Sequence, residues 1–370
     1  MKYRVLCITD RSDLPETELF IGLKNAGVDI EVVCNPTGKH YNRLKISDVP
    51  VIDLILSYRV NPSGIKKLRH IFNSKKYDII YCFNNKAASN ALLASFNIPV
   101  TFITYRGVAG NISFLSPASW MTHLNHKVKK IICVSDSVKS YFLSLKFFWL
   151  KLNPEKPVTI YKGHELSWYQ SKPADLSKFN IPPDAFVVGF AGRNRPNKGI
   201  KFIVDSARWL PRDTTVHYLL IGKLTKNKKL HRQINKSPLR KNFHLTGFRV
   251  DAPALAAACN AFIMPSVKKE GLSRAIIEAM AYGTPPIVTN IGGQPELVVH
   301  QESGLVVPPK NPAAIADAIM NLYGNPKKAK KLGENARERI YTHFNSRTTV
   351  KKTKHLFEQL LKTDNTPIAF

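Results

Sequence analysis

The sequence predicts an α/β protein made of two doubly wound domains with parallel sheets, and three observations lead to that prediction. Short apolar segments of strand length alternate with helix-like segments, and the alternation restarts near the middle of the chain. A proline-rich stretch at about 153–183, typical of a linker, separates the two series. The 370 residues also suit two domains of ordinary size better than one core.

The elements of the first series follow from their apolar periodicity. A strand at 3–9 precedes a helix over 16–24, and further strands are predicted at 29–34, 77–83, 99–105 and 129–135. The second series has strands at 186–192, 216–222, 243–247, 261–266 and 285–290. Three helices close the chain, at 312–323, 326–342 and 347–362. Apolar strands separated by helices indicate parallel sheets that are covered on both faces.

The formal net charge of +29 is the most pronounced feature of the composition. Such an excess repels itself, so it indicates an anionic partner: nucleic acid, a membrane surface or a phosphate-bearing substrate. A generally basic, solvated surface is the other interpretation. Between Lys223 and Lys241, eight Lys and Arg residues occur without one acidic residue.

The cysteines and the N-terminus indicate a reducing compartment. The five cysteines are scattered, so we expect buried thiols and neither a disulfide frame nor a zinc site. We see no signal peptide and no membrane span, and we expect the chain to begin in the cytoplasm.

Two glutamates flank a predicted helix start after the strand at 261–266. Ser273 suits the helix cap, which places Glu270 in the preceding loop and Glu278 inside the helix, off its buried face. The unpaired N–H groups of a helix start favour phosphate. Carboxylates beside it suit the hydroxyls of sugars on a diphosphate, because each can accept two hydrogen bonds from a diol.

Two cations follow the strand at 186–192 and could neutralise a diphosphate leaving group. Arg193 comes after Gly192, where a backbone can approach a ligand closely, and Lys198 precedes Gly199. No Asp-x-Asp stretch presents a metal site. The chain has 55 basic residues, and taken alone these two are explained equally well as two of them that lie on a loop by chance.

Several runs together resemble the retaining GT-B glycosyltransferases of family 4. They are GRNRPNKG, MPSVKKEGLSRAIIEAMAYGTPPIVT with its Glu-x7-Glu spacing, and IGGQPELV followed by ESGLVVP. The segments IICVSDSVKSYF and VTIYKGHELSWY resemble that family's passage between its domains. The resemblance covers residues 129–340 and is collinear.

The resemblance implies two Rossmann-like domains facing across a cleft, with a C-terminal helix that crosses back to the first. On this chain these are an acceptor-binding domain over 1–168, a nucleotide-sugar-binding domain over 169–345 and a helix within 346–370. The implied activity moves a hexose or related sugar from a UDP-, GDP- or ADP-sugar to an acceptor hydroxyl, with retention and without a metal or other cofactor. Lipopolysaccharide or other cell-surface glycan biosynthesis in bacteria is the implied setting.

The resemblance also assigns roles to single residues. Arg193 and Lys198 would bind the donor phosphates, and Glu270 would contact hexose hydroxyls. Glu278 would hold the ribose. The remaining donor-site candidates are Gly192, Phe248 and Arg249, the last two bordering the base, and Gly271, Leu272 and Ser273, whose backbone amides would seat the distal phosphate.

The first half departs from the family's pattern. TDRSDLPET stands where many members carry a Gly-Gly loop, and Arg106 stands where many carry a histidine. An arginine cannot act as a base near neutrality but can hold a phosphate or carboxylate, so Arg106 is a candidate catalytic contact to an anion. The acceptor candidates are Asp10, Arg11, Ser12, Asp13, Tyr105 and His123; for His123 an ordinary packing role is the simpler interpretation.

An aromatic run between lysines, within 141–156, is a further candidate for function. Phe147, Phe148 and Trp149 stand between Lys146 and Lys151, where we expect a surface helix to end. Such a run suits insertion at an anionic lipid interface, and packing at the domain junction explains it equally well. The first interpretation predicts a protein that is peripheral on the inner face of the plasma membrane and reaches a lipid-linked acceptor.

Two alternatives to the transferase are open. The charge alone also fits a nucleic-acid-binding protein, but no recognisable module accompanies the basic run, so we expect no nucleic-acid partner. A sugar-nucleotide epimerase or phosphorylase on the same two-domain fold is an alternative closer to the transferase. The Glu-x7-Glu motif together with GRNRPNKG favours the transferase.

Overall fold

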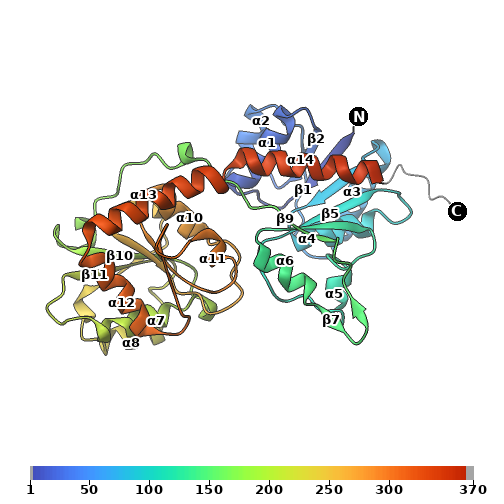
Figure 1. Cartoon of the computed structure of the whole chain (residues 1–370). Helices are drawn as coiled ribbons and strands as arrows, with labels where there is room; N and C mark the ends of the chain where they lie inside the picture. Colours follow the sequence, from blue (N-terminus) through green and yellow to red (C-terminus); the bar gives the residue numbers. More distant parts are fainter. Residues whose placement is uncertain (1–2, 364–370) are drawn as a thin grey trace. The chain divides into compact units, whose positions relative to one another are not determined.

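The structure, a computed structural model, describes residues 3–363 and divides the chain into two compact units (Figure 1). Within the described residues, unit 1 contains 3–164 together with 344–363, and unit 2 is Glu165–His343. The sequence placed the boundaries at 168/169 and 345/346. Each unit is built on one large parallel sheet, as the predicted fold class requires.

Unit 1 has a seven-stranded sheet in the order β3-β2-β1-β4-β5-β6-β9. Its strands are β1 (Arg4–Ile8), β2 (Asp29–Cys34), β3 (Val51–Asp53), β4 (Ile79–Cys82), β5 (Thr101–Arg106), β6 (Val128–Cys133) and β9 (Pro157–Thr159). The central strand β1 is fully buried from Val5 to Ile8, because helices cover both faces of the sheet. The strand order reverses between β1 and β4, where sheets of this kind bind ligands beyond the strands' carboxyl ends.

The helices of unit 1 include the last helix of the chain. They are α1 (Leu14–Asn25), α2 (Tyr41–Ile46), α3 (Pro62–Ser74), α4 (Asn85–Ala94), α5 (Pro117–Trp120), α6 (Asp136–Leu143) and α14 (Ser346–Thr363). α14 packs against α1 (Figure 1). Its Leu356, Phe357 and Leu360 belong to the same hydrophobic core as residues of the sheet such as Val5 and Val32. The predicted return of the C-terminal helix to the first domain is therefore confirmed.

Unit 2 has a six-stranded sheet in the order β12-β11-β10-β13-β14-β15. Its strands are β10 (Phe186–Ala191), β11 (Val216–Ile221), β12 (Phe243–Gly247), β13 (Ala261–Met264), β14 (Pro286–Thr289) and β15 (Leu305–Val307). Its α-helices are α7 (Ile200–Ser206), α8 (Lys228–Asn235), α9 (Ala252–Ala257), α10 (Arg274–Ala281), α11 (Gln294–Leu297), α12 (Pro312–Tyr323) and α13 (Pro326–His343). The order reverses between β10 and β13, which marks the expected ligand edge.

Two segments differ from their predicted structure. The predicted linker at 153–183 contains strand β9, which pairs with β6 at the edge of the sheet of unit 1. Proline is tolerated at the first position of an edge strand, so Pro157 does not prevent the pairing. Within 141–156, where we expect a surface helix to end, α6 does end, at Leu143. The aromatic residues after it form a hairpin of β7 (Lys146–Phe147) and β8 (Leu150–Lys151), which was not predicted from the sequence.

The cysteines are all buried free thiols, as expected. Burial raises the pKa of Cys34 to about 11 and that of Cys133 to about 12. Over residues 3–363, none of the helices has both the length and the apolar character that crossing a bilayer requires.

His123 is buried in unit 1 between two polar partners. Its Nδ1 lies 2.9 Å from Oγ1 of Thr104, and its Nε2 lies 3.2 Å from Oδ1 of Asn85. A neutral ring satisfies both by accepting from the hydroxyl and donating to the amide oxygen. Burial, with a smaller contribution from the charge of Arg106, lowers the pKa of His123 from 6.5 to about 3.

We predict that replacing Gly22 with alanine destabilises unit 1, although alanine favours a helix. A Cβ on Gly22 of α1 would lie 2.5 Å from Cγ2 of Val350 on α14. Overpacking of this kind costs about 1–3 kcal/mol, which exceeds the roughly 1 kcal/mol that alanine contributes over glycine in a helix. Thermal unfolding should show a lower midpoint for Gly22→Ala. In a Val350→Ala background, where Cγ2 is gone, the same substitution should be neutral or stabilising; equal effects in both backgrounds would contradict this packing.

We predict that His123 weakens unit 1 on mild acidification. Its folded pKa, about 3, lies below the unfolded value of 6.5, so the unfolded chain takes up the proton first as pH falls. The free energy of unfolding should drop progressively between these values, by about 2 kcal/mol at about pH 5. Urea titrations of the wild type and of His123→Gln, which does not titrate, measure this. Equal losses in the two proteins would exclude a buried neutral histidine.

Candidate active site

A pocket of about 600 Å³ opens beyond the carboxyl ends of β10, β11 and β12 in unit 2. The start of α10 forms another part of its wall. The position is the one expected for a ligand site, next to the reversal of strand order between β10 and β13. Its charged and amide side chains are Arg193, Asn194, Lys223, Arg249, Arg274 and Glu278.

Two glycines let the strand ends approach each other beside this pocket. Gly222 follows β11 with φ +140°, and a Cβ there would lie 2.0 Å from the carbonyl oxygen of Gly192, which follows β10. Only glycine allows so close an approach in that conformation. The next residues in the chain, Arg193 and Lys223, consequently both line the pocket.

The first turns of α10 place Glu278 at the pocket. Ser273 is the N-cap, as predicted, although its side chain makes no capping hydrogen bond. The buried residues of the helix are Ile276, Ile277, Ala279, Met280 and Ala281, whereas Glu278 lines the pocket. Nε of Arg274 lies 3.2 Å from Oε1 of Glu278, one turn away on the same helix. This ion pair orients a carboxylate that can still accept hydrogen bonds from a ligand.

Lys198 and Glu270 contact each other in the loops next to the pocket. Nζ of Lys198 donates to both carboxylate oxygens of Glu270, at 3.0 and 2.8 Å. The hydroxyl of Ser266 donates to the same carboxylate at 2.8 Å. Glu270 is only 6% exposed, so this charge needs its partners. The three hydrogen bonds leave acceptor capacity on the carboxylate, since two oxygens offer about four lone-pair sites.

The loops that carry this pair are held at very short backbone separations. A Cβ on Gly199 would lie 1.9 Å from the carbonyl oxygen of Pro265, and one on Gly292 would lie 1.9 Å from that of Glu270. The amide of Val267 donates to the carbonyl of Asn197 at 2.9 Å. The connections after β10, β13 and β14 therefore form one packed edge around the ion pair.

The predicted donor residues thus fall into two adjoining groups. Gly192, Arg193, Phe248, Arg249 and Glu278 line the pocket. Lys198 and Glu270 form the ion pair, and Gly271, Leu272 and Ser273 connect Glu270 to α10. Arg249 is also engaged with the carboxylate of Asp251, at 2.8 and 2.7 Å.

Sequence reasoning missed three polar residues of the pocket: Asn194, Lys223 and Arg274. Lys223 directly follows a predicted strand, so the rule that ligands bind beyond strand ends would have found it. Arg274 is the first residue of α10 and lies four positions before Glu278, so the i,i+4 spacing on the predicted helix would have indicated their contact.

Unit 1 has a pocket of about 630 Å³ at the corresponding edge of its own sheet. Of the acceptor candidates, Asp10, Arg11 and Tyr105 line it, together with Arg106. The charged and amide residues that sequence reasoning missed there are Glu16, Arg59, Asn84, Asn85 and Lys86. Four basic side chains face two acidic ones in this lining, and Nζ of Lys86 lies 2.7 Å from Oδ2 of Asp10. The remaining excess of positive charge suits an anionic ligand.

Three acceptor candidates, Ser12, Asp13 and His123, do not line this pocket and make hydrogen bonds within unit 1, as Arg106 of the lining also does. Asp13 is the N-cap of α1 and accepts from the amide of Glu16, and Ser12 accepts a hydrogen bond from Thr17. The guanidinium of Arg106 donates to the carbonyls of Val108 and Gly110, so it shapes the loop after β5. His123 is buried, in contact with Asn85 of the pocket lining.

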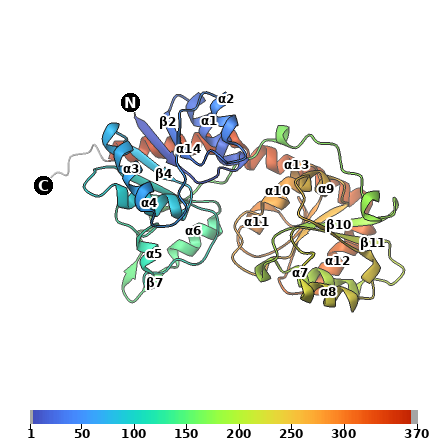
Figure 2. The same cartoon turned by 180° about the vertical axis from the view of Figure 1, so that it is seen from behind.

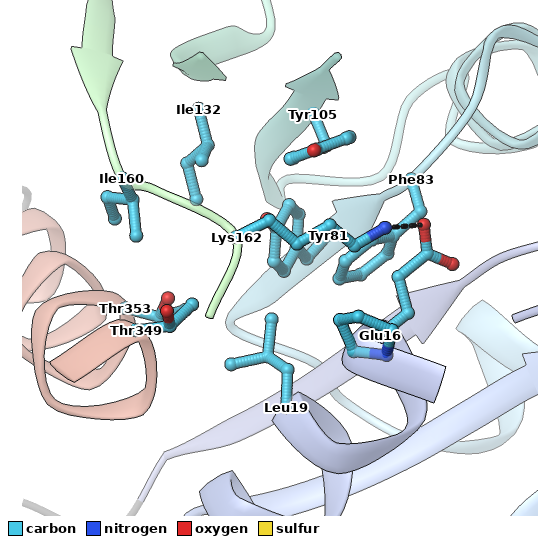
Figure 3. Close-up of a pocket in the computed structure, with 11 residues that line it drawn as sticks. Glu16, Leu19, Tyr81, Phe83, Tyr105, Ile132, Ile160, Lys162, Thr349 and Thr353 are labelled. Carbon is cyan, nitrogen blue, oxygen red and sulfur yellow. Dashed lines mark hydrogen bonds and ion pairs between the residues drawn. The ribbon is translucent and has the colours of Figure 1, made fainter. Parts of the chain in front are cut away.

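A partly buried lysine, Lys162, ties the start of α1 to the segment that leaves unit 1. Nζ of Lys162 contacts Oε1 of Glu16 at 3.1 Å (Figure 3). It also contacts Oδ2 of Asp13 at 2.7 Å and lies over the ring of Tyr105. Burial alone would lower the pKa of Lys162, but Glu16, Tyr105 and Asp13 raise it well above its usual range. Burial raises the pKa of Glu16, and Lys162 opposes that rise. The lysine thus fixes Glu16, which is one of the residues that line the unit 1 pocket.

Both halves of the chain match models of known protein families. Residues 17–168 match Glycosyltransferase Family 4, and residues 171–339 match Glycosyl transferases group 1. An Escherichia coli protein named UDP-Gal:alpha-D-GlcNAc-diphosphoundecaprenol alpha-1,3-galactosyltransferase is 24% identical over 94% of this chain and 92% of its own length.

Solved glycosyltransferase structures share the fold over nearly the whole chain. A crystal structure of a Rickettsia africae glycosyltransferase has a TM-score of 0.81 at 22% identity and covers 99% of this chain and 100% of that one. Anabaena Alr3699/HepE in complex with UDP has a TM-score of 0.75 at 24% identity, over 96% of this chain and 100% of that one, and the same protein has been crystallised with UDP-glucose. This chain is therefore a glycosyltransferase of family 4 with the GT-B fold of two Rossmann-like domains.

Proposed function

We propose that this glycosyltransferase moves a hexose or related sugar, with retention, from a nucleoside-diphosphate sugar bound in unit 2 to a hydroxyl of a phosphate-bearing, lipid-linked acceptor. The assignment of the donor site rests on the pocket of unit 2, which is lined by Arg193, Lys223 and Arg274 together with Glu278. The named ligands of Alr3699/HepE, UDP and UDP-glucose, support a donor of this class.

The pocket offers a separate place for each part of such a donor. Phe248 is exposed at the rim, where its ring can stack on the base. Glu278 can accept hydrogen bonds from the two ribose hydroxyls. Arg193 and the first amides of α10 can hold the diphosphate, and Glu270, at the neighbouring loop, can accept from hydroxyls of the sugar.

The proposed mechanism relies on cations that are in place before the reaction. When the bond between sugar and diphosphate breaks, negative charge grows on the leaving phosphate, and Arg193 and Lys198 stabilise it without a bound metal. Glu270 holds Lys198 in position through both carboxylate oxygens. The oxygen of the acceptor hydroxyl forms a bond to the anomeric carbon on the face from which the diphosphate leaves, and its proton passes to the leaving phosphate oxygen. The new bond replaces the old one on the same face, which gives retention.

The acceptor half rests on the basic pocket of unit 1. Arg11, Arg59, Lys86 and Arg106 line it, and a diphosphate on the acceptor would compensate their charge. The diphosphoundecaprenol-linked acceptor in the name of the Escherichia coli relative supports this class. We therefore place the activity in the assembly of a cell-surface glycan such as lipopolysaccharide.

We predict that Glu278→Ala weakens UDP binding by about 10- to 100-fold, the equivalent of losing hydrogen bonds to a charged acceptor. Titration calorimetry with UDP measures the change. Glu334→Ala, which removes an exposed acid from α13 in the same unit, is the matched control and should bind like the wild type. If Glu278→Ala and Glu334→Ala bound UDP with equal affinity, Glu278 would not be part of the donor site.

We predict that Lys198→Met harms both stability and transfer, and that the two effects can be separated. The variant leaves the carboxylate of Glu270 buried without its cation, which costs about 3–5 kcal/mol for a buried pair, less to the extent that Lys198 reaches solvent. Lys198→Met/Glu270→Gln removes that charge and should regain most of the melting temperature. Sugar transfer should stay at least roughly 100-fold below wild type in both variants, because the cation at the leaving phosphate is gone.

The control for these two variants is Lys330→Met, which removes an exposed lysine from α13. It should change neither the melting temperature nor the rate of sugar transfer. Transfer at the wild-type rate by the stable double variant would show that Lys198 has only a structural part.

A further inference from the structure

The β7–β8 hairpin of unit 1 ends in a turn made of bulky aromatic residues. Lys146 pairs with Lys151 and Phe147 with Leu150, so Phe148 and Trp149 form the two-residue turn. Short turns of this kind normally use glycine or asparagine at positions of positive φ. Phe148 nevertheless has φ +51°. A bulky side chain in this conformation is uncommon and costs energy, which indicates that the ring is needed there for a purpose other than folding.

The rings of this turn face solvent. Phe148 is 76% exposed and Trp149 is 89% exposed. The Phe147 and Phe148 ring centroids lie 4.6 Å apart, and those of Phe148 and Trp149 lie 5.8 Å apart, so the three rings form one continuous apolar tip. We call Phe147, Phe148 and Trp149 the aromatic tip.

The base of the hairpin carries like charges directly opposite each other. Lys146 and Lys151 are cross-strand partners, and both are exposed. Like charges in such a pair destabilise a hairpin unless an anion lies near them. From 126 to 156 the chain has seven lysines and two acidic residues, so the surroundings add positive charge.

Further exposed apolar side chains lie in the neighbouring segments of unit 1. Leu143 ends α6, the helix that leads into the hairpin. Leu115 lies before α5, and Trp120 is the last residue of that helix. Tyr141 of α6 exchanges two hydrogen bonds with the backbone of Ile112, at 2.9 and 2.8 Å, which ties these segments together. Both views show α5, α6 and β7 at the same end of unit 1 (Figures 1 and 2).

We propose that the aromatic tip inserts into the surface of a bilayer whose anionic headgroups contact Lys146 and Lys151. An apolar tip followed by a pair of lysines matches the order of layers in such a bilayer, in which acyl chains lie beneath charged headgroups. Trp149 has the side chain that is most typical of this interface, an apolar ring with one polar N–H. A second copy of the chain is a poorer occupant, because two hairpins docked tip to tip would bring their lysine pairs together.

This inference goes beyond sugar transfer and does not depend on the donor site. It gives unit 1 a means of meeting an acceptor embedded in lipid. Its test uses no nucleotide and no transfer assay, so the donor proposal and the membrane proposal can fail separately.

The first experiment measures flotation of the full chain with vesicles that contain phosphatidylglycerol, and with vesicles of phosphatidylcholine alone. The wild type should bind the anionic vesicles in a salt-dependent manner and the neutral ones far less. Phe148→Ser/Trp149→Ser should weaken binding roughly tenfold, and Lys146→Gln/Lys151→Gln should weaken it about fivefold for each lysine. Trp209→Ser is the matched control: Trp209 is 65% exposed in unit 2 and should not matter.

The second experiment places the tip in the bilayer. Lipids brominated on their acyl chains should quench part of the emission of the four tryptophans. Trp149→Phe keeps an aromatic ring, so it should bind vesicles nearly as well as the wild type while losing most of the quenching.

Three results would overturn the proposal. They are wild-type binding that does not need anionic lipid, binding that is unchanged in the Phe148→Ser/Trp149→Ser variant at an unchanged melting temperature, and quenching that persists in Trp149→Phe. Light scattering provides a further check, since an oligomer that dissociates when the tip is removed would identify a second copy as the occupant in place of lipid.

Discussion

The ion pair between Lys198 and Glu270 holds together the edge of unit 2 on which the proposed donor chemistry depends. A buried carboxylate is costly without a nearby cation, and Lys198 supplies it at 3.0 and 2.8 Å from the two oxygens. The lysine comes from the connection after β10 and the glutamate from the connection after β13. Their pairing therefore couples two loops that are far apart in the sequence and sets the position of each.

The glycines around this pair explain why the edge is so closely packed. Gly199 and Gly292 each admit a neighbouring carbonyl to within 1.9 Å of where a Cβ would be, so any larger residue would separate the loops. Beside the pocket, Gly222 likewise admits the carbonyl oxygen of Gly192 to within 2.0 Å of where a Cβ would be. Because the loops cannot spread, the cations they carry keep their positions, and fixed cations stabilise a developing phosphate charge without reorganisation.

The sequence predicts the frame of the molecule well because its parallel strands are apolar, short and regularly spaced. β2 and β12 have their predicted bounds, as does α12 with its Asn311 cap. Strand β9 was missed because proline-rich composition indicates a linker, whereas an edge strand tolerates Pro157 at its first position. The β7–β8 hairpin was missed because Phe148 occupies a turn position where composition predicts glycine.

Within the site, motif spacing predicted which residues would gather but not how they would pair. Glu278 and Arg193 line one pocket, as their places after a helix start and a strand end suggest. The contact of Lys198 with Glu270 spans 72 positions, and nothing in the local pattern of either loop indicates it. In unit 1, Arg59 reaches the pocket from irregular chain before α3, where periodicity carries no information.

The most direct test of the central claim is hydrogen exchange of the full chain with and without UDP. The claim is that the packed edge of unit 2 binds a nucleoside diphosphate between its fixed cations and the start of α10. Exchange should then slow at the amides of 192–198 and 271–278 and remain unchanged in the core strands of unit 1. Unchanged exchange in both segments at saturating UDP, or slowing confined to unit 1, would contradict the claim.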